Sequence, residues 1–235
     1  VVFGCVTQLG EQSANIARTA LLSAGWPESI PGLTVDRKCG SGESAIHVAM
    51  GLIDSGQCEV VVAGGAENMS RVPMGGNRDV HGKAFGWQVE SRFEMVTQGE
   101  AAERLADLWR ISREEMDSFA LESHRRAAGA AAAGWFRREL EDVELNDWAE
   151  REAALGSAKF EGDETIRRDT SAEKLASLKP SFREAGRVTA GNASQIADGA
   201  AAVLLMSREA ADRLGVRPRA ALRSPTTVGP DPTLR

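Results

Sequence analysis

The sequence predicts an α/β fold built in layers, and three features of the residue pattern favour it. Residues 1–6, 33–36 and 60–65 are short runs of strand-forming residues, separated by segments whose apolar residues recur at helical spacing. The run at 60–65 is apolar throughout and rich in valine, which is typical of a strand covered on both faces in a parallel sheet. The pattern resumes near residue 186 after a long interruption. Alternation of this kind indicates a layered α/β fold.

Two helices are predicted between the first three strands. Residues 16–24 carry apolar side chains at helical spacing, and Gly25 followed by Pro27 ends this helix. Residues 41–53 repeat the pattern, with their apolar positions on one helical face. The chain therefore begins with two consecutive strand-helix pairs that lead into the apolar strand.

The middle of the chain is predicted to be an insertion that interrupts the sheet. The periodicity disappears between residues 68 and 91, where glycine, proline, arginine and methionine are frequent. Residues 100–136 are strongly helical in pattern, and Ser112 with Glu115 forms the signature of a capping box. We expect a mostly helical insertion.

Strand-forming residues return near the end of the chain. Residues 200–206 are predicted to form another buried strand, and residues 219–222 to start a further one. The resulting assignment is an α/β domain at 1–68 and 183–208, an inserted domain at 69–182, and the start of a truncated further half at 209–235. Because the chain opens directly on a strand, we also expect that an earlier segment is missing.

Composition excludes several classes of function. The 34 acidic and 28 basic residues among 235 give a net charge of −6, which offers no basic surface for a nucleic acid. Three cysteines without a CxxC spacing, beside only three histidines, predict neither a disulfide framework nor a metal site. Reduced thiols of this kind suit a cytoplasmic location. No apolar run is long enough for membrane insertion.

Cys39 is the candidate catalytic residue. It lies between the strand predicted at 33–36 and the helix predicted from Ser41, and the small residues Gly40 and Gly42 allow a tight turn there. The positive end of a helix dipole favours a thiolate, which is the attacking form of cysteine. The same helix start has N–H groups that could bind a developing oxyanion. For a cysteine taken alone, burial as a small apolar residue is the commoner role.

Other polar residues favour structural interpretations. Cys5 and Cys58 are expected to fill space, because one lies in a strand and the other leads into one. Glu67 follows a strand in a glycine-rich turn, where its carboxylate is expected to accept backbone N–H groups. His47 falls about two turns beyond Cys39 and is expected to lie on the face of its helix.

Four strings together resemble the thiolase family, in its order and spacing, over essentially the whole chain. They are residues 4–8 (Gly-Cys-Val-Thr-Gln), 35–42 (Val-Asp-Arg-Lys-Cys-Gly-Ser-Gly), 61–70 (Val-Val-Ala-Gly-Gly-Ala-Glu-Asn-Met-Ser) and 186–194 (Gly-Arg-Val-Thr-Ala-Gly-Asn-Ala-Ser). The resemblance implies a thiolase-like αβαβα layered fold, of which this chain holds mainly the N-terminal half. It also implies an acyl-CoA C-acyltransferase that cleaves 3-ketoacyl-CoA with CoA, or condenses acyl-CoAs.

The resemblance assigns roles to individual residues. Cys39 matches the family's acyl-accepting nucleophile, and coenzyme A enters as substrate and product, with no tightly bound cofactor. The residues that match the family's CoA-binding positions are Arg167, Phe182, Ala190, Gly191 and Ser194. The inserted domain then corresponds to the family's CoA-binding loop domain. A homodimer or a dimer of dimers is implied in the same way.

The sequence also departs from the family. Residues 98–101 read Gln-Gly-Glu-Ala where many members have Met-Gly-Thr-Thr, which resembles the branch that acts on bulkier acyl groups, including steroid side chains. Asp36 stands where many members have asparagine. The family's Asn-Glu-Ala-Phe, Gly-His-Pro and second Cys-Gly strings, which supply the activating histidine and the second base, do not occur.

Three hypotheses stay open at this point. The chain belongs to an acyltransferase, or it is a non-catalytic CoA-binding or assembly subunit, or it belongs to a related condensing enzyme such as a ketoacyl synthase. The long insertion and the string at 64–70 argue against the last of these. A reading frame that continues past Arg235 into a Gly-His-Pro string would favour the enzyme, and a stop codon there would favour the subunit.

Overall fold

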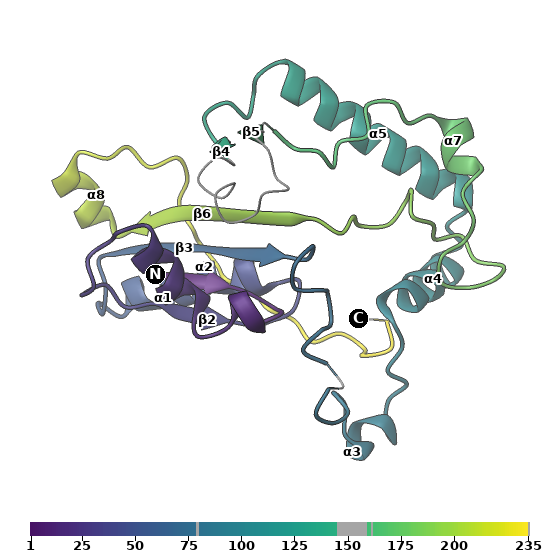
Figure 1. Cartoon of the computed structure of the whole chain (residues 1–235), viewed down its shortest axis with the longest axis horizontal. Helices are drawn as coiled ribbons and strands as arrows, with labels where there is room; N and C mark the ends of the chain where they lie inside the picture. The colour runs from purple at the N-terminus through teal and green to yellow at the C-terminus, as the bar shows by residue number, and fades with distance from the viewer. Residues whose placement is uncertain (79, 145–158, 161, 235) are drawn as a thin grey trace, which may run out of the picture. The chain divides into compact units, whose positions relative to one another are not determined.

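The computed structural model describes residues 1–78, 80–144, 159–160 and 162–234. The chain divides into two compact units (Figure 1). The first, here called the sheet unit, comprises Val1–Arg92 and Ile196–Gly229, and the second, the helical unit, comprises Phe93–Gln195 and Pro230–Arg235. These limits differ from the predicted domain boundaries, since residues 69–92 join the sheet unit and 183–195 the helical unit.

The sheet unit is built on a mixed sheet. Its strands are β1 (Val2–Gly4), β2 (Leu33–Val35), β3 (Val60–Asn68) and β6 (Asp198–Met206), in the order β2-β1-β3-β6. β1 pairs in parallel with both β2 and β3, whereas β6 runs antiparallel to β3 along its whole length, from Val60 opposite Met206 to Asn68 opposite Asp198. The strands predicted near residues 1, 33, 60 and 200 are confirmed.

Helix packing against this sheet forms the core. The helical segments of the unit are η1 (Gly10–Gln12), α1 (Ile16–Ser23), α2 (Ser41–Asp54), α3 (Trp87–Glu90) and α8 (Arg208–Leu214). The methyl groups of Ala45 and Ala49 on α2 are fully buried against Val2, Val61 and Ala63. Small side chains on α2 let the helix lie close to β1 and β3. The helices predicted at 16–24 and 41–53 are confirmed as α1 and α2.

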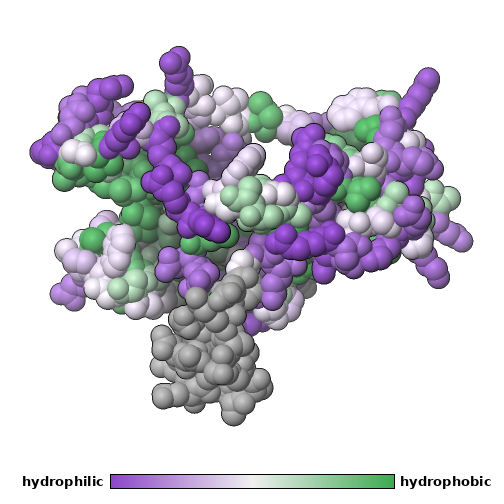
Figure 2. All heavy atoms as spheres, turned by 90° about the horizontal axis from the view of Figure 1, so that it is seen from above, coloured by the Kyte–Doolittle hydropathy of each residue, from purple (hydrophilic) through white to green (hydrophobic). Residues whose placement is uncertain are grey.

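Three predictions about strands are wrong. β6 was expected to be buried, but Val203 is 47% and Leu204 58% exposed, because β6 is the end strand of the described sheet and α2 packs chiefly on β1 and β3. Figure 2 shows apolar atoms at the surface of the sheet unit. β3 is buried on one face only, since Val61 is 4% and Val60 41% exposed. Residues 219–222 form no strand, and Leu222 is exposed.

The helical unit contains the predicted insertion helices. They are α4 (Gln98–Trp109) and α5 (Arg113–Ala132). The unit also contains α7 (Ala172–Ala176), which was not predicted, and a short antiparallel pair of β4 (Val143–Glu144) and β5 (Lys159–Phe160). The predicted capping box is confirmed: Ser112 Oγ accepts the N–H of Glu115 at 3.1 Å, and the Glu115 carboxylate accepts the N–H of Ser112 at 2.8 Å. Arg110, in the left-handed region at φ 55°, separates α4 from α5.

Within the described ranges given above, none of the helices is both long enough and apolar enough to cross a membrane.

Candidate active site

Cys39 lies in the turn that joins β2 to α2, as predicted. α2 begins at Ser41 with Gly40 as its N-cap, so the cysteine stands just before the first turn of the helix. Its side chain is exposed. An exposed thiol at this point is accessible to a reactant from solvent.

The backbone of this turn is strained and held by side chains. Lys38 has φ +50°, in the left-handed region that residues other than glycine seldom occupy. Its N–H donates to Asp36 Oδ1 at 2.8 Å. Ser41 Oγ, 4% exposed as a residue, accepts the Arg37 N–H at 2.8 Å and donates to the Lys38 carbonyl at 2.6 Å. These hydrogen bonds hold the backbone around Cys39 in one conformation. Backbone strain such as that at Lys38 is frequent at functional sites.

Close packing with β1 fixes the start of α2. A Cβ atom at Gly4 would lie 2.4 Å from the carbonyl carbon of Ser41 and 2.6 Å from the nitrogen of Gly42, distances too short for any side chain. Gly4 therefore allows the strand to touch the first turn of the helix. Sequence reasoning placed Gly4 in a family string without giving it this role.

Two backbone N–H groups that follow the cysteine already donate hydrogen bonds. Gly40 N–H donates to the Arg37 carbonyl at 3.1 Å, and Ser41 N–H donates to the Lys38 carbonyl at 2.9 Å. An oxyanion at this turn would therefore need donors other than these two groups. The nearby cations are paired as well, since Lys38 binds Asp36 and Arg37 binds Glu43, each at 2.7 Å.

Glu67 has the structural role that the sequence predicted. Its carboxylate accepts the N–H groups of Val6 at 2.8 Å and Thr7 at 3.1 Å, and the side-chain amide of Gln12 at 2.9 Å. Burial opposes ionisation of this group, but the hydrogen bonds outweigh it and hold the pKa of Glu67 below its ordinary value. Nearby Cys5 is 1% exposed, and burial, followed by the negative charge of Glu67, raises its pKa to about 11.

The other predicted site residues belong to the helical unit. Ser181 N–H donates to the Val188 carbonyl at 2.9 Å, which brings the residue before Phe182 beside the segment of Ala190 and Gly191. Phe182 is 49% exposed, and its ring covers Gly99 so closely that a Cβ there would lie 2.0 Å from a ring carbon. Ala190 and Ser194 are exposed, and Gly191 is half-buried.

Arg167 lies on a neighbouring segment of the helical unit. Its side chain is exposed, and its backbone N–H donates to Nδ1 of His124 on α5 at 3.2 Å. Gln195 donates from Nε2 to the Thr165 carbonyl at 2.5 Å and so joins this segment to the end of the predicted CoA loop. The contact made by His124 had no signal in the sequence.

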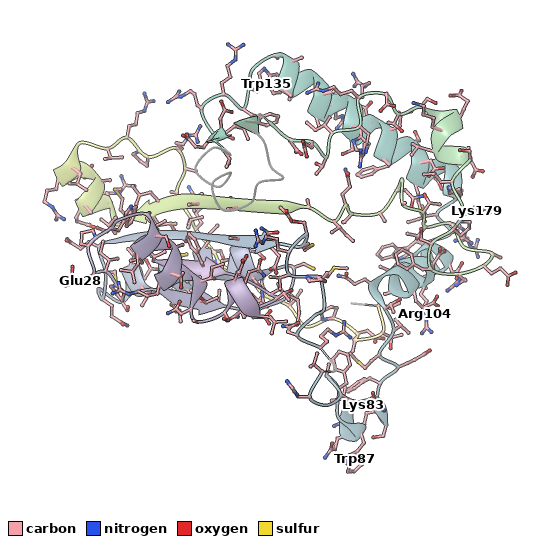
Figure 3. All side chains as sticks on the ribbon, in the orientation of Figure 1. Glu28, Lys83, Trp87, Arg104, Trp135 and Lys179 are labelled. Carbon is pink, nitrogen blue, oxygen red and sulfur yellow. The ribbon has the colours of Figure 1, made fainter. Side chains whose placement is uncertain are left out.

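Sequence reasoning also missed the polar residues that carry the loop at 186–194. Glu103 on α4 is 1% and Asp117 on α5 is 7% exposed, and both bind groups of this loop. Arg104, which projects from α4 in Figure 3, instead binds the surface carboxylates of Glu94 and Glu100. In the sequence Glu103, Asp117 and Arg104 are all charged residues of a helical pattern. Nothing in that pattern distinguishes the two buried carboxylates from the surface arginine. Among the residues that the structure describes, no cluster of three His, Cys, Asp or Glu could hold a metal ion.

In this α/β sheet an exposed cysteine, which is a potential nucleophile, lies directly before α2. Residues 1–209 match the family model of the thiolase N-terminal domain. The chain belongs to the thiolase family, and its fold is the α/β thiolase fold.

Individual relatives agree with this assignment. The chain is 41% identical over 242 residues to the steroid 3-ketoacyl-CoA thiolase FadA6 of Mycobacterium tuberculosis, covering 99% of this chain and 56% of that protein. It is 42% identical over 234 residues to a beta-ketoadipyl-CoA thiolase of Pseudomonas putida, covering 94% and 57%. The crystal structure of the Bacillus anthracis acetyl-CoA acetyltransferase matches with a TM-score of 0.77 and 39% identity, covering 92% and 56%. The chain thus spans somewhat more than half the length of these relatives.

Proposed function

We propose that the chain carries the acyl-accepting cysteine of an acyl-CoA C-acyltransferase that cleaves 3-ketoacyl-CoA or runs the reverse condensation. The observation that carries this proposal is the exposed Cys39 thiol in the strained turn before α2. The family's relatives include proteins named 3-ketoacyl-CoA thiolase and acetyl-CoA acetyltransferase, which supports the same reaction class.

The proposed reaction has two half-reactions. The Cys39 thiolate attacks the 3-keto carbonyl, the bond between C2 and C3 breaks, and the acyl group remains on sulfur as a thioester while acetyl-CoA leaves after protonation of its carbanion. The thiol of a second CoA then attacks this thioester, releasing a shortened acyl-CoA and the cysteine. Dividing the transfer in this way lowers each barrier and predicts ping-pong kinetics.

The helical unit is the proposed CoA-binding part. Arg167 offers an exposed guanidinium for a phosphate, and guanidinium groups bind phosphate oxygens well. The half-exposed ring of Phe182 offers an apolar wall for the pantetheine arm, and the exposed edge formed by Ala190, Gly191 and Ser194 offers backbone groups beside it. CoA is substrate and product in this proposal, and no tightly bound cofactor takes part.

The substrate and the setting are proposed more coarsely. The string at 98–101, which forms the first turn of α4, resembles the branch with bulkier acyl groups, so we infer a 3-ketoacyl-CoA of fatty acid or steroid side-chain type. A homodimer or a dimer of dimers follows from the family resemblance. A cytoplasmic location is supported by three cysteines that form no disulfide with one another.

CoA-dependent cleavage of a 3-ketoacyl-CoA tests this function. In the complete enzyme to which this chain belongs, we expect cleavage with ping-pong kinetics, abolished in Cys39→Ala and retained in Cys58→Ala, whose half-buried thiol lies outside the turn. Tight CoA binding without cleavage, and equal behaviour of the wild type and Cys39→Ala, would favour the non-catalytic CoA-binding subunit instead.

A further inference from the structure

A buried carboxylate stands behind the loop of residues 186–194. Glu103 Oε1 accepts the N–H groups of Arg187 and Val188, both at 2.8 Å, and Oε2 accepts the Arg187 N–H at 3.0 Å. The side chain lies 1% exposed in the helical unit. Removing a carboxylate from water is unfavourable unless hydrogen bonds replace the lost hydration, so these N–H groups and Glu103 stabilise one another.

The loop is shaped to receive this carboxylate. A Cβ atom at Gly186 would lie 2.3 Å from Glu103 Oε1, so only glycine lets the backbone come this close. The next two N–H groups along the chain then point at the same carboxylate. Glu103 on α4 therefore holds the beginning of the loop in place.

A second anchor holds the middle of the loop. Asn192 donates from Nδ2 to Asp117 Oδ1 at 2.9 Å and to the Arg187 carbonyl at 3.0 Å, and its Oδ1 accepts the Thr189 N–H at 2.8 Å. Asp117 is held in turn by Arg113 Nε at 2.7 Å. Asn192 thus closes the loop on itself and ties it to α5.

These anchors leave one side of the loop facing outward. Thr189 is fully buried, and a Cβ atom at Gly191 would lie 2.5 Å from Leu175 and 2.6 Å from Leu178, so the inner side is filled. Ala190 and Ser194 remain exposed. The inner contacts decide how the outer backbone is presented.

We propose that Glu103 is a positioning residue for coenzyme A, which fixes the loop at 186–194 in the form that receives the pantetheine arm, with Asn192 and Asp117 as the second anchor. The inference rests on the proposed function, because it assumes that this loop contacts CoA. In this proposal Glu103, which is buried away from the exposed edge of the loop, controls the affinity for CoA by holding the loop backbone in place.

Calorimetric titration with CoA and hydrogen exchange of the same protein test the proposal. In Glu103→Gln, which preserves shape but replaces one acceptor oxygen and the charge, we expect CoA affinity to fall by about tenfold or more. Peptides covering 186–194 should exchange faster, while peptides covering the first half of α5 keep their protection. Asn192→Ala should show the same pattern and decides the question if Glu103→Gln does not fold.

Glu184→Gln is the matched control, because Glu184 is an exposed carboxylate of the adjoining segment, and it should bind CoA like the wild type. Unchanged CoA affinity in Glu103→Gln and Asn192→Ala, with a wild type that binds CoA, would overturn this inference alone. Loss of affinity together with loss of protection in α5 would also overturn it, because Glu103 would then support the unit in general. A wild type that does not bind CoA would refute the CoA-binding role and the inference with it.

Discussion

The three cysteines occupy three different environments, which separates their chemistry. Cys39 is exposed in the turn before α2, Cys58 is half-buried, and Cys5 is 1% exposed beside the Glu67 carboxylate. Burial and that negative charge raise the pKa of Cys5 to about 11, so it stays a neutral thiol at physiological pH. The sequence could predict where Cys39 lies, because a turn before a helix is visible in the small residues around it. The sequence pattern alone could not mark it as a nucleophile, and that interpretation came from the family resemblance.

Alkylation of the native protein tests this separation. With iodoacetamide near pH 8 we expect rapid modification of Cys39 and slow modification of Cys5, since the thiolate is the reacting form and Cys5 is both buried and protonated. Mass mapping of peptides over time gives the two rates, and unfolded protein serves as the control in which the rates converge. Equal rates in the native protein would contradict the account.

Glu67 links the start of the chain to β3, and its ionisation makes this link dependent on pH. Glu67→Gln should lower the free energy of unfolding by about 1–3 kcal/mol near pH 7, because three donors lose a charged acceptor. The pKa of Glu67 is lower in the folded state than its ordinary 4.5, so the stabilisation is complete above about pH 4.5 and is lost as the pH falls through the folded value.

Urea unfolding at several pH values measures this contribution. The difference between the wild type and Glu67→Gln should be largest at neutral pH and shrink in acid. Glu11→Gln is the control, since Glu11 is 65% exposed in its ion pair with Arg71 and should change stability by about 0.5 kcal/mol or less. A difference that grew on acidification would be inconsistent with the proposed role of Glu67.

At the scale of elements, the contact between β1 and the start of α2 positions the turn of Cys39. Gly4→Ala should destabilise the protein by roughly 2 kcal/mol or more, because the new methyl group meets the backbone at Ser41 and Gly42. Gly51→Ala lies in the same helix, where the added Cβ meets open space, and should stabilise it by about 0.5–1 kcal/mol. Thermal unfolding of the two variants should therefore shift in opposite directions, and a shift in the same direction would contradict this packing.

The helices and strands were easier to predict than the burial of their side chains. The strands β1, β2 and β3 and the helices α1 and α2 followed from apolar periodicity, because each pattern is local. The exposure of β6 could not be predicted, since Val203 and Leu204 look like core residues until the strand order puts them at the end of the sheet. The burial of Glu103 was equally invisible, because it depends on a loop more than eighty residues away.

At the scale of the whole molecule, the residues on which the proposed function depends are divided between the two units. The sheet unit contains Cys39, and the helical unit contains Arg167, Phe182 and the loop at 186–194. The chain spans somewhat more than half the length of its relatives. Acyl acceptance by Cys39 is therefore the part of the proposed reaction that this chain itself must supply.

Mass spectrometry after incubation with acetyl-CoA or a 3-ketoacyl-CoA tests that claim most directly. We expect one added acyl group, mapped to the peptide containing Cys39, removed by excess CoA and absent from Cys39→Ser. An acyl group found on Cys58 or Cys5, or no adduct at all in a protein that cleaves the substrate, would contradict it.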